Sequence, residues 1–372
     1  MGRASTLAAV LLVGACELPP TISPDAGIDG AGPAGECGAA PTALDLLFLI
    51  DNSNSMAQEQ ASLADCFGGF GFGALVDPPD MDQDDKFDRE PVGDLHVGFI
   101  SPDMGTGGYE VPTCDDPVDG DDGLLLHAPS PTLSGCKAEY PRFLSWSAGD
   151  ETSVLRRDFA CLATLGTGGC AFEQHLRAVS RALVDHAGGP NAGFLRDDSF
   201  LAVVIQSDED DASVRKDVEA ERIFDPDDDE LGPLNLRPFR NPDLLVSPAE
   251  IAEGLLALRP CPERLFVGAI VGTPIESQCT LYPSPDLDCL LAEPAMRERI
   301  DYSAFGQGER LVPVCDVPGL GEAFPARRVL ELLRELQSAG ANVAVVSICE
   351  SDPWLVFAMM AEHFASLAGG ER

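Results

Sequence analysis

The chain has 372 residues, of which 45% are hydrophobic, and its 62 acidic residues outnumber 24 basic ones to give a net charge of −38. This length and hydrophobic content suffice for one large domain or two modest ones. The negative charge argues against binding to nucleic acids and to anionic membrane surfaces, and no internal stretch approaches the roughly 20 apolar residues that a transmembrane helix requires.

The first residues of the chain have the features of an export signal. Arg3 supplies positive charge, and Leu7–Val13 forms a short apolar core, which is too short for a membrane helix. The core ends in Val13-Gly14-Ala15-Cys16. This run resembles the lipobox of bacterial lipoproteins, in which small residues precede a cysteine that is lipidated and becomes the new N-terminus. The resemblance implies a signal peptide over residues 1–15 and, on Cys16, a diacylglycerol and a further acyl chain such as palmitate. The alternative is an ordinary signal peptide followed by a chance cysteine.

Residues 16–43 are expected to form the lipidated cysteine and a flexible tether. The stretch 17–43 is rich in Pro, Gly and Ala and offers little that packs into a core. A coil of this length spans roughly 30 Å, which would hold a domain clear of a membrane. Two or more acyl chains anchor a protein stably, so the resemblance implies a bacterial cell-envelope protein. Glu17 favours the outer membrane, because an inner-membrane retention signal usually has Asp at that position.

From residue 44 to residue 368, short apolar runs alternate with helical patterns. Five runs are rich in Val, Ile and Leu and nearly continuous, as is typical of strands covered on both faces; they are Leu44–Ile50, Leu95–Ser101, Leu201–Gln206, Arg264–Val271 and Asn342–Ile348. Five segments have helical patterns, namely Met56–Cys66, Glu173–His186, Pro248–Leu258, Ala326–Ala339 and Pro353–Ala368. This alternation predicts an α/β fold: a Rossmann-like, doubly wound and mainly parallel sheet with helices on both faces.

Long insertions interrupt this framework, at about residues 67–93, 102–160, 208–247 and 273–325, and they carry most of the cysteines. Export places those cysteines in an oxidising compartment where disulfides persist. Proximity along the chain favours the pairs Cys114–Cys136, Cys161–Cys170 and Cys279–Cys289. Lipidation of Cys16 would leave eleven of the 12 cysteines, an odd number, so at least one thiol is expected to be free or to pair between chains.

Polar oxygens follow two of the predicted strands. The first strand runs into Asp51-Asn52-Ser53-Asn54-Ser55, and the third runs into Ser207-Asp208. Between them, the glycine-rich turn LGTGG presents Thr167 shortly before a predicted helix. Ligands of parallel sheets bind at the carboxyl ends of the strands, so these oxygens are expected to point toward one place.

In this order the three motifs resemble those of the von Willebrand factor A (VWA) domain family. In that family a DxSxS motif, a threonine from a turn and a strand-ending aspartate form a metal-ion-dependent adhesion site (MIDAS). The resemblance covers about residues 44–368, with the insertions unmatched. It implies a divalent cation, Mg²⁺ first and Mn²⁺ or Ca²⁺ as alternatives, bound by Asp51, Ser53, Ser55, Thr167 and Asp208. The hydroxyls would contact the ion, and the two aspartates would act directly or through water.

The chemistry of the cation explains this choice of residues. Mg²⁺ takes six oxygen ligands and keeps waters readily. Asp51 and Asp208 only balance its charge, so one position remains for water or for a partner's oxygen, best supplied by a carboxylate. The sequence departs from the family where a glycine is replaced, giving Glu209-Asp210-Asp211. One of these acids in the open position would close the site and shift its preference toward Ca²⁺, which takes more carboxylates.

The predicted function is metal-dependent protein binding or adhesion by a cell-envelope lipoprotein. The alternative is a structural envelope component, in which the metal site is closed or unused and the disulfide-stapled insertions make the contacts. An enzyme is not expected, because the chain has no GxSxG, HExxH or P-loop motif. The partner is expected to be a protein that offers a carboxylate, with no nucleic acid involved, and the oligomeric state is left open.

Overall fold

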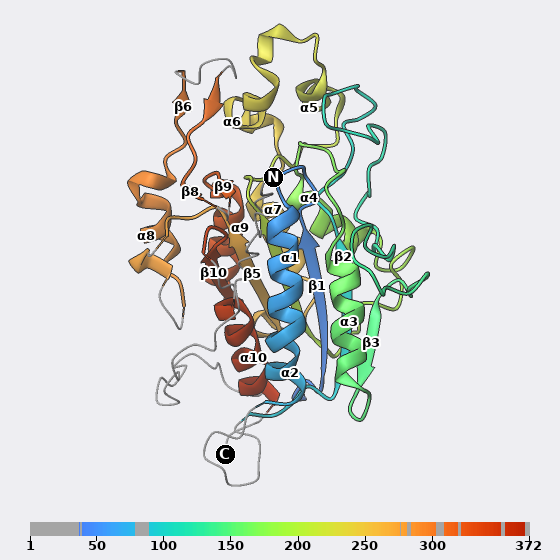
Figure 1. Cartoon of the computed structure of the whole chain (residues 1–372). Helices are drawn as coiled ribbons and strands as arrows, with labels where there is room; N and C mark the ends of the chain where they lie inside the picture. Colours follow the sequence, from blue (N-terminus) through green and yellow to red (C-terminus); the bar gives the residue numbers. More distant parts are fainter. Residues whose placement is uncertain are drawn as a thin grey trace, which may run out of the picture.

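A six-stranded sheet forms the centre of the molecule. The computed structural model describes residues 37, 39–78, 89–275, 277–280, 284–302, 309–318, 321–350 and 354–368. The strands lie in the order β10-β5-β4-β1-β2-β3 (Figure 1). They are β1 (Ala43–Ile50), β2 (Asp94–Ile100), β3 (Leu144–Ser147), β4 (Phe200–Ser207), β5 (Leu265–Val271) and β10 (Asn342–Ser347). Only β3 runs antiparallel to its neighbour in this sheet, so the predicted mainly parallel sheet is confirmed.

The five strands predicted from apolar runs are all present, each within one residue of its predicted ends. The strand β3 is not predicted by the sequence pattern and lies inside the predicted insertion 102–160. This strand has four residues, with buried Leu144 and Trp146 alternating with exposed serines. Such a short, half-buried edge strand lacks the continuous apolar run that identified the others.

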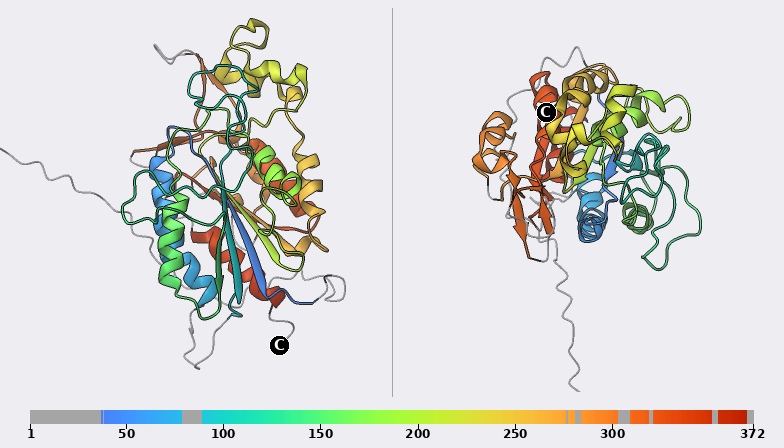
Figure 2. Two further views of the ribbon diagram at one scale, coloured as in Figure 1. Left: turned by 90° about the vertical axis from the view of Figure 1, so that its right-hand side faces the viewer. Right: turned by 90° about the horizontal axis from the view of Figure 1, so that it is seen from above.

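Helices cover both faces of the sheet (Figures 1 and 2). One face is covered by α1 (Ala57–Cys66), α3 (Thr152–Ala163) and α10 (Trp354–Ala368), and the other by α4 (His175–Ser180), α7 (Pro248–Leu256) and α9 (Arg327–Ser338). Because α7 begins with Pro248 and α9 ends before Gly340, whose φ is +95°, both ends follow common capping patterns. The predicted α/β fold with helices on both faces is confirmed.

Alternate residues of the strands build two separate cores, one on each face. On β1, Leu46, Phe48 and Ile50 face α1, α3 and α10, whereas Leu47 and Leu49 face α4, α7 and α9. This follows from the two-residue repeat of side-chain direction along a strand. Since β1 is central and buried on both faces, its sequence is an almost unbroken apolar run.

The first helix is longer than its sequence pattern predicts. After α1 the chain continues through a π-helical turn (Phe67–Gly71) into α2 (Phe72–Val76). Phe67 and Phe72 are fully buried and lie 4.4 Å apart between ring centroids. The expected insertion at 67–93 therefore begins with core structure. The sequence here is rich in glycine, which is typical of loops, so it does not predict a helix. The glycines are Gly68, Gly69, Gly71 and Gly73.

The other insertions also contain ordered elements. The segment 102–160 holds β3 and the start of α3, and the segment 208–247 holds α5 (Val218–Glu221) and α6 (Arg237–Arg240). The segment 273–325 holds α8 (Leu287–Ala292) and two small hairpins, β6 (Ile300–Asp301) with β7 (Arg310–Leu311) and β8 (Cys315–Val317) with β9 (Gly321–Ala323). A small apolar cluster around Phe172, Val214 and Phe224 supports the segment 208–247. Figure 1 shows α5, α6 and β6 gathered beyond the carboxyl end of β1.

Three of the disulfides between described residues connect an insertion to the rest of the domain, but two of the three predicted pairings are wrong. The pairs are Cys37–Cys261, Cys114–Cys170, Cys136–Cys161, Cys279–Cys289 and Cys315–Cys349. Only Cys279–Cys289 was predicted correctly, because the fold brings Cys114 to Cys170 and Cys136 to Cys161 across longer stretches of chain. Cys66 is disulfide-bonded as well, and none of the described cysteines is free. Of the two outcomes expected for an odd number of cysteines, a free thiol or a pair between chains, the free thiol is therefore contradicted for this part of the chain.

The number of disulfides indicates an extracytoplasmic protein. Within the described ranges, no helix has both the length and the apolar composition needed to cross a membrane. The expected signal peptide, the lipobox-like run with Cys16 and most of the tether lie outside the described residues.

Candidate metal centre

The strand order reverses at the boundary between β1 and β4. From β1 the sheet extends to β2 and β3 on one side, and to β4, β5 and β10 on the other. In open α/β sheets, ligands bind at such a reversal, outside the carboxyl ends of the strands. Asp51 directly follows β1 and Asp208 directly follows β4, so both acids lie at the position where this architecture binds ligands.

Asp51 is fully buried and fixes the loop that follows β1. Its backbone N–H donates to the carbonyl of Gln206 on β4 at 3.0 Å. Its carboxylate accepts a hydrogen bond from the N–H of Ser53 at 2.7 Å and another from the hydroxyl of Ser207 at 2.6 Å. Asp51 therefore holds the first serine of the DxSxS motif in place and ties its loop to the end of β4.

The two serines and Asp208 lie beside one another. The Oγ atoms of Ser53 and Ser55 are 3.4 Å apart, and the hydroxyl of Ser55 lies near enough to the carboxylate of Asp208 to favour its charged form. Asp208 is 5% exposed, and its Oδ1 has no hydrogen-bond partner among the described residues. A buried carboxylate oxygen without a partner is costly, so this atom is suited to a ligand or a water.

The turn that carries Thr167 is attached to the same loop. The N–H of Gly169 donates to the carbonyl of Asn52 at 2.9 Å. The side chain of Gln60 accepts from the N–H of Gly166 at 3.1 Å and donates to its carbonyl at 2.9 Å. A Cβ at position 169 would lie 2.1 Å from Oδ1 of Asn52, so the close approach of the two loops requires glycine there. The half-buried Thr167 therefore belongs to a turn fixed against the DxSxS loop.

Three further acids, Glu59, Glu173 and Glu209, lie near this site, and only Glu209 is predicted there from the sequence. Glu173 is 4% exposed, and its pKa is raised by burial and then by the charges of Asp51 and Glu209. The pKa of Glu209 is raised by burial and by Asp208 and Asp51. Glu59, on α1, is 8% exposed and also has a raised pKa, through burial first and the charge of Asp51 last.

Burial and neighbouring negative charge act together on Asp208. Burial, followed by the charge of Asp51, raises the pKa of Asp208 to about 7, although the hydroxyl of Ser55 opposes this change. The largest charge effects on Asp208, Glu173 and Glu209 all come from other acids. The site therefore has a negative charge that a bound cation would compensate.

Glu173 was recognised in the sequence only as the start of a helix. It lies six positions after Thr167, in the otherwise apolar or uncharged segment 170–173. An acid directly after an apolar run is the signal that would have identified it, because unpaired charges are rarely buried without a function.

Two of the three acids after Asp208 point away from the site. Asp210 accepts a hydrogen bond from the backbone N–H of Arg328 at 3.0 Å. The carboxylate of Asp211 accepts hydrogen bonds from the N–H of Leu176 at 3.0 Å and from the guanidinium of Arg328 at 3.0 Å. Only Glu209 remains close enough to Asp208 and Asp51 for their charges to raise its pKa. Of the three acids expected to be able to close the site, only Glu209 therefore remains a candidate.

The donor atoms at this place fit a hard cation. They are carboxylate and hydroxyl oxygens, the ligand types that Mg²⁺ and Ca²⁺ prefer. Among the described residues, no three His, Cys, Asp or Glu side chains bring ligand atoms within 4.8 Å of one another at this site. An ion here would need hydroxyls and waters as well as carboxylates, as the DxSxS pattern implies.

A comparison of the chain with protein families and with curated proteins finds no match to either. The VWA resemblance therefore rests on the three motifs and on their positions in the fold.

Proposed function

We propose that this protein binds a divalent cation at the carboxyl ends of β1 and β4 and uses it to bind another protein. Mg²⁺ is the preferred ion, with Mn²⁺ and Ca²⁺ as alternatives. The ligand set is that implied by the VWA resemblance: Asp51, Ser53, Ser55, Thr167 and Asp208. The observation that carries the proposal is the buried Oδ1 atom of Asp208, which has no hydrogen-bond partner among the described residues. Asp208 lies beside Ser55, and the charge of Asp51 raises its pKa.

The arrangement of this chain's residues supports a site with an open position. Asp51 orients Ser53 through its backbone N–H, and the turn with Thr167 is held by Gly169 against Asn52. These contacts preform the ligand loops, so little ordering would be required on binding. When bound, the cation would supply a positive charge with a free coordination position. A carboxylate from the partner protein suits that position, since three of the five proposed ligands are neutral hydroxyls and the two aspartates only balance the charge of the ion.

The second candidate is a structural envelope component with a closed site. This candidate is favoured by the position of Glu209, which lies close enough to Asp208 and Asp51 for their charges to raise its pKa. In this case Glu209 would take the coordination position that a partner would otherwise occupy, and the ordered insertions around α5, α6 and β6 would make the contacts. Both candidates are binding functions, and neither requires catalysis.

The discriminating experiment compares capture of envelope proteins with Mg²⁺ and with EDTA, using the disulfide-bonded protein. Metal-dependent partner binding predicts proteins that are retained only with Mg²⁺ and lost with Asp51→Asn. The Glu209→Gln variant separates the two candidates, because opening a closed site should increase Mg²⁺-dependent capture. Capture that is identical with Mg²⁺, with EDTA and with Asp51→Asn would contradict the proposed function and favour the structural component.

The proposed location is the bacterial cell envelope, with the protein anchored through lipid on Cys16 and the outer membrane favoured by Glu17. The disulfides support an extracytoplasmic compartment.

A further inference from the structure

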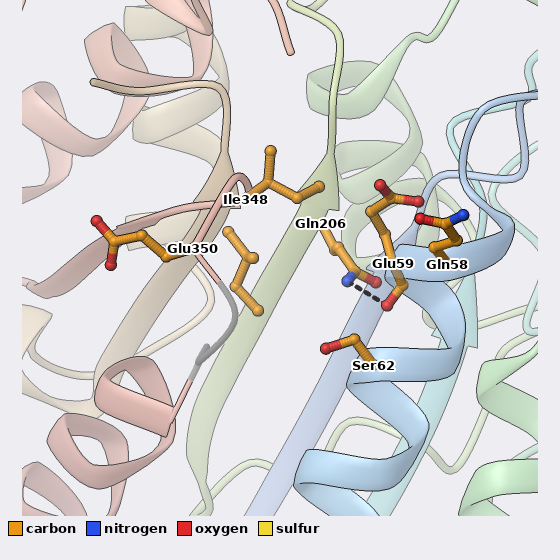
Figure 3. A pocket seen from close by; sticks show the side chains of 7 residues that line it. Gln58, Glu59, Ser62, Gln206, Ile348 and Glu350 are labelled. Atoms are coloured by element: carbon orange, nitrogen blue, oxygen red, sulfur yellow. Dashed lines mark hydrogen bonds between the residues drawn. The ribbon is translucent and has the colours of Figure 1, made fainter. Parts of the chain in front are cut away.

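A second polar pocket lies beside the candidate metal centre and is separate from the proposed ligands. It lies between α1 and the carboxyl ends of β4, β5 and β10, and Glu59, Ser62, Gln206 and Ile348 are among the residues that line it (Figure 3). The backbone of Gln206 contacts Asp51, whereas its side chain lines this pocket. The two sites are therefore neighbours that share a strand end but have different side chains.

Two acceptor atoms of the pocket are buried without a partner. Oε2 of Glu59 and Oε1 of Gln206 have no hydrogen bond among the described residues, and the two residues are 8% and 2% exposed. The amide orientation of Gln206 is fixed, because its Nε2 donates to the carbonyl of Glu59 at 2.9 Å. The oxygen of the amide therefore remains as an acceptor. Buried acceptors of this kind are expected to receive hydrogen bonds from a ligand or from water.

The rest of the pocket restricts the chemistry of that ligand. Both unpartnered atoms are acceptors and one is a carboxylate oxygen, so the ligand must donate hydrogen bonds and should carry positive charge. Ile270 and Ile348 add apolar walls, and Figure 3 shows Ile348 between Glu350 and the pair Glu59 and Gln206. A compact cation surrounded by oxygen is poorly matched to walls of isoleucine. An ammonium group on an alkyl chain fits both features, since it has three donors, no acceptor and an apolar stem.

We propose that this pocket binds a primary ammonium group, supplied by a lysine side chain of a partner protein. The ammonium donates to Oε2 of Glu59 and Oε1 of Gln206, and the alkyl stem packs on Ile270 and Ile348. The amine site itself stands without the metal. Its assignment to the same partner that offers a carboxylate rests on the proposed function, and it implies that the partner presents a lysine close to an acidic residue.

The first test locates binding directly in the unmodified, disulfide-bonded protein. Nα-acetyl-lysine methylamide is titrated in EDTA while the methyl signals of Ile270 and Ile348 are followed by NMR. Saturable shifts of both signals are expected. The Nα,Nε-diacetyl compound has no charge and should give no saturable shift. An absent response to the amine, or an equal response to the neutral compound, overturns the proposal and leaves a water-filled pocket.

Variants then test the acceptors. Glu59→Gln should weaken binding of the lysine probe about tenfold or more, because the negative charge that strengthens the hydrogen bond to the ammonium is lost. Asp65→Asn is the matched control, since Asp65 is an exposed acid on the same helix, and it should leave the affinity unchanged. Equal weakening by both variants would show nonspecific attraction to an acidic surface and would overturn the proposal.

The experiment separates the amine site from the metal centre. Lysine binding that persists in EDTA and in Asp51→Asn supports the pocket even if Mg²⁺ proves to have no effect on the protein. Displacement of the lysine probe by Ca²⁺ or Mg²⁺ in Asp51→Asn would identify the pocket as a cation site and overturn the amine assignment. A Mg²⁺ response without lysine binding would leave the proposed function standing and remove this inference.

Discussion

At the scale of single residues, Asp51 is the most informative position. It contributes half of the carboxylate charge of the proposed ligand set and holds Ser53 and Ser207 in place. Mg²⁺ should raise the melting temperature of the wild-type protein, because a ligand that binds only the folded state adds about 2.7 kcal/mol at a hundredfold excess over Kd. Asp51→Asn should abolish this increase while preserving the shape of the side chain. Differential scanning calorimetry with Mg²⁺ and with EDTA measures both effects.

Matched controls are needed because the acidic surface can attract cations generally. Asp65→Asn changes the same charge at an exposed position and should leave the increase intact. Ser53→Ala should reduce the increase only in part, since water can replace one neutral ligand. If Mg²⁺ raises the melting temperature of wild type and of Asp51→Asn by the same amount, the DxSxS loop only ends the strand and does not bind the ion.

The raised pKa of Asp208 predicts how stability depends on pH. Its pKa is about 7 in the folded protein, compared with about 3.9 for an exposed aspartate. The folded state therefore binds the proton more tightly. The resulting stabilisation is complete below about pH 4 and is lost as the pH rises through about 7. In EDTA, the free energy of unfolding should carry a component that declines between about pH 4 and 7, and Asp208→Asn should remove that component.

Cation binding should show the opposite dependence on pH. Carboxylates must be deprotonated to coordinate a metal, so the affinity for Mg²⁺ should increase up to about pH 7 and then level off. Calorimetric titrations at pH 5.5 and 7.5, in buffers of different ionisation enthalpy, would measure the released protons. An affinity that does not change with pH would indicate that Asp208 is not among the ligands.

The residues of the site were predictable to different degrees. Asp51, Ser53 and Asp208 follow predicted strands directly, so the strand pattern alone places them at one edge of the sheet. Glu173 follows a turn and precedes a short helix, and its position depends on contacts of residues 170–173 with distant segments: Phe172 packs on Phe224, and the carbonyl of Glu173 accepts from the N–H of Ala212. Such packing has no periodic signature in the sequence, which is why this acid was missed.

At the scale of elements, the contact between two loops sets the position of Thr167. A Cβ at position 169 would lie 2.1 Å from Asn52, whereas a Cβ at position 168 would make an ordinary contact with Asp115 at 3.7 Å. Gly169→Ala should therefore push the threonine turn away from the DxSxS loop, cost about 1–3 kcal/mol of stability and weaken the response to Mg²⁺. Gly168→Ala is the matched control and should stay within about 0.5 kcal/mol of wild type. Equal behaviour of the two variants in denaturation and Mg²⁺ titration would show that the turn is not part of the site.

The elements that the sequence predicted correctly have strong local patterns. The strands β4 and β5 are buried over their whole length, and β1 is buried at every residue after Ala43; this produces continuous apolar runs. By contrast, α3 lies in a segment with many loop residues, and three charged residues separate its buried positions Leu155 and Phe159, which are followed by buried Leu162. That spacing is helical, but the surrounding glycines, prolines and acids obscured it. The wrong disulfide pairs have a related cause, because pairing depends on tertiary proximity and not on distance along the chain.

At the scale of the whole molecule, the tether joins the domain at the end opposite the candidate metal centre. Cys37 is bonded to Cys261, which lies just before β5, at the amino end of the strands. The site and most of the insertions lie beyond the carboxyl ends (Figure 1). An anchor at Cys16 would therefore hold the amino ends of the strands toward the membrane, with the metal centre and the amine pocket facing outward to a partner.

This orientation relative to a membrane requires lipidation of Cys16. Cys16→Ser should release the protein from membranes and prevent labelling by a palmitate analogue, because no other anchor is proposed. Cys37→Ala with Cys261→Ala is the control: it removes a neighbouring disulfide but should leave the protein in the membrane fraction. Mass analysis of the peptide containing Cys16 gives an independent measurement. A disulfide between Cys16 and Cys66 would contradict the prediction, since a thioether to a diacylglycerol uses the same sulfur, and the chain would then be an exported protein without this anchor.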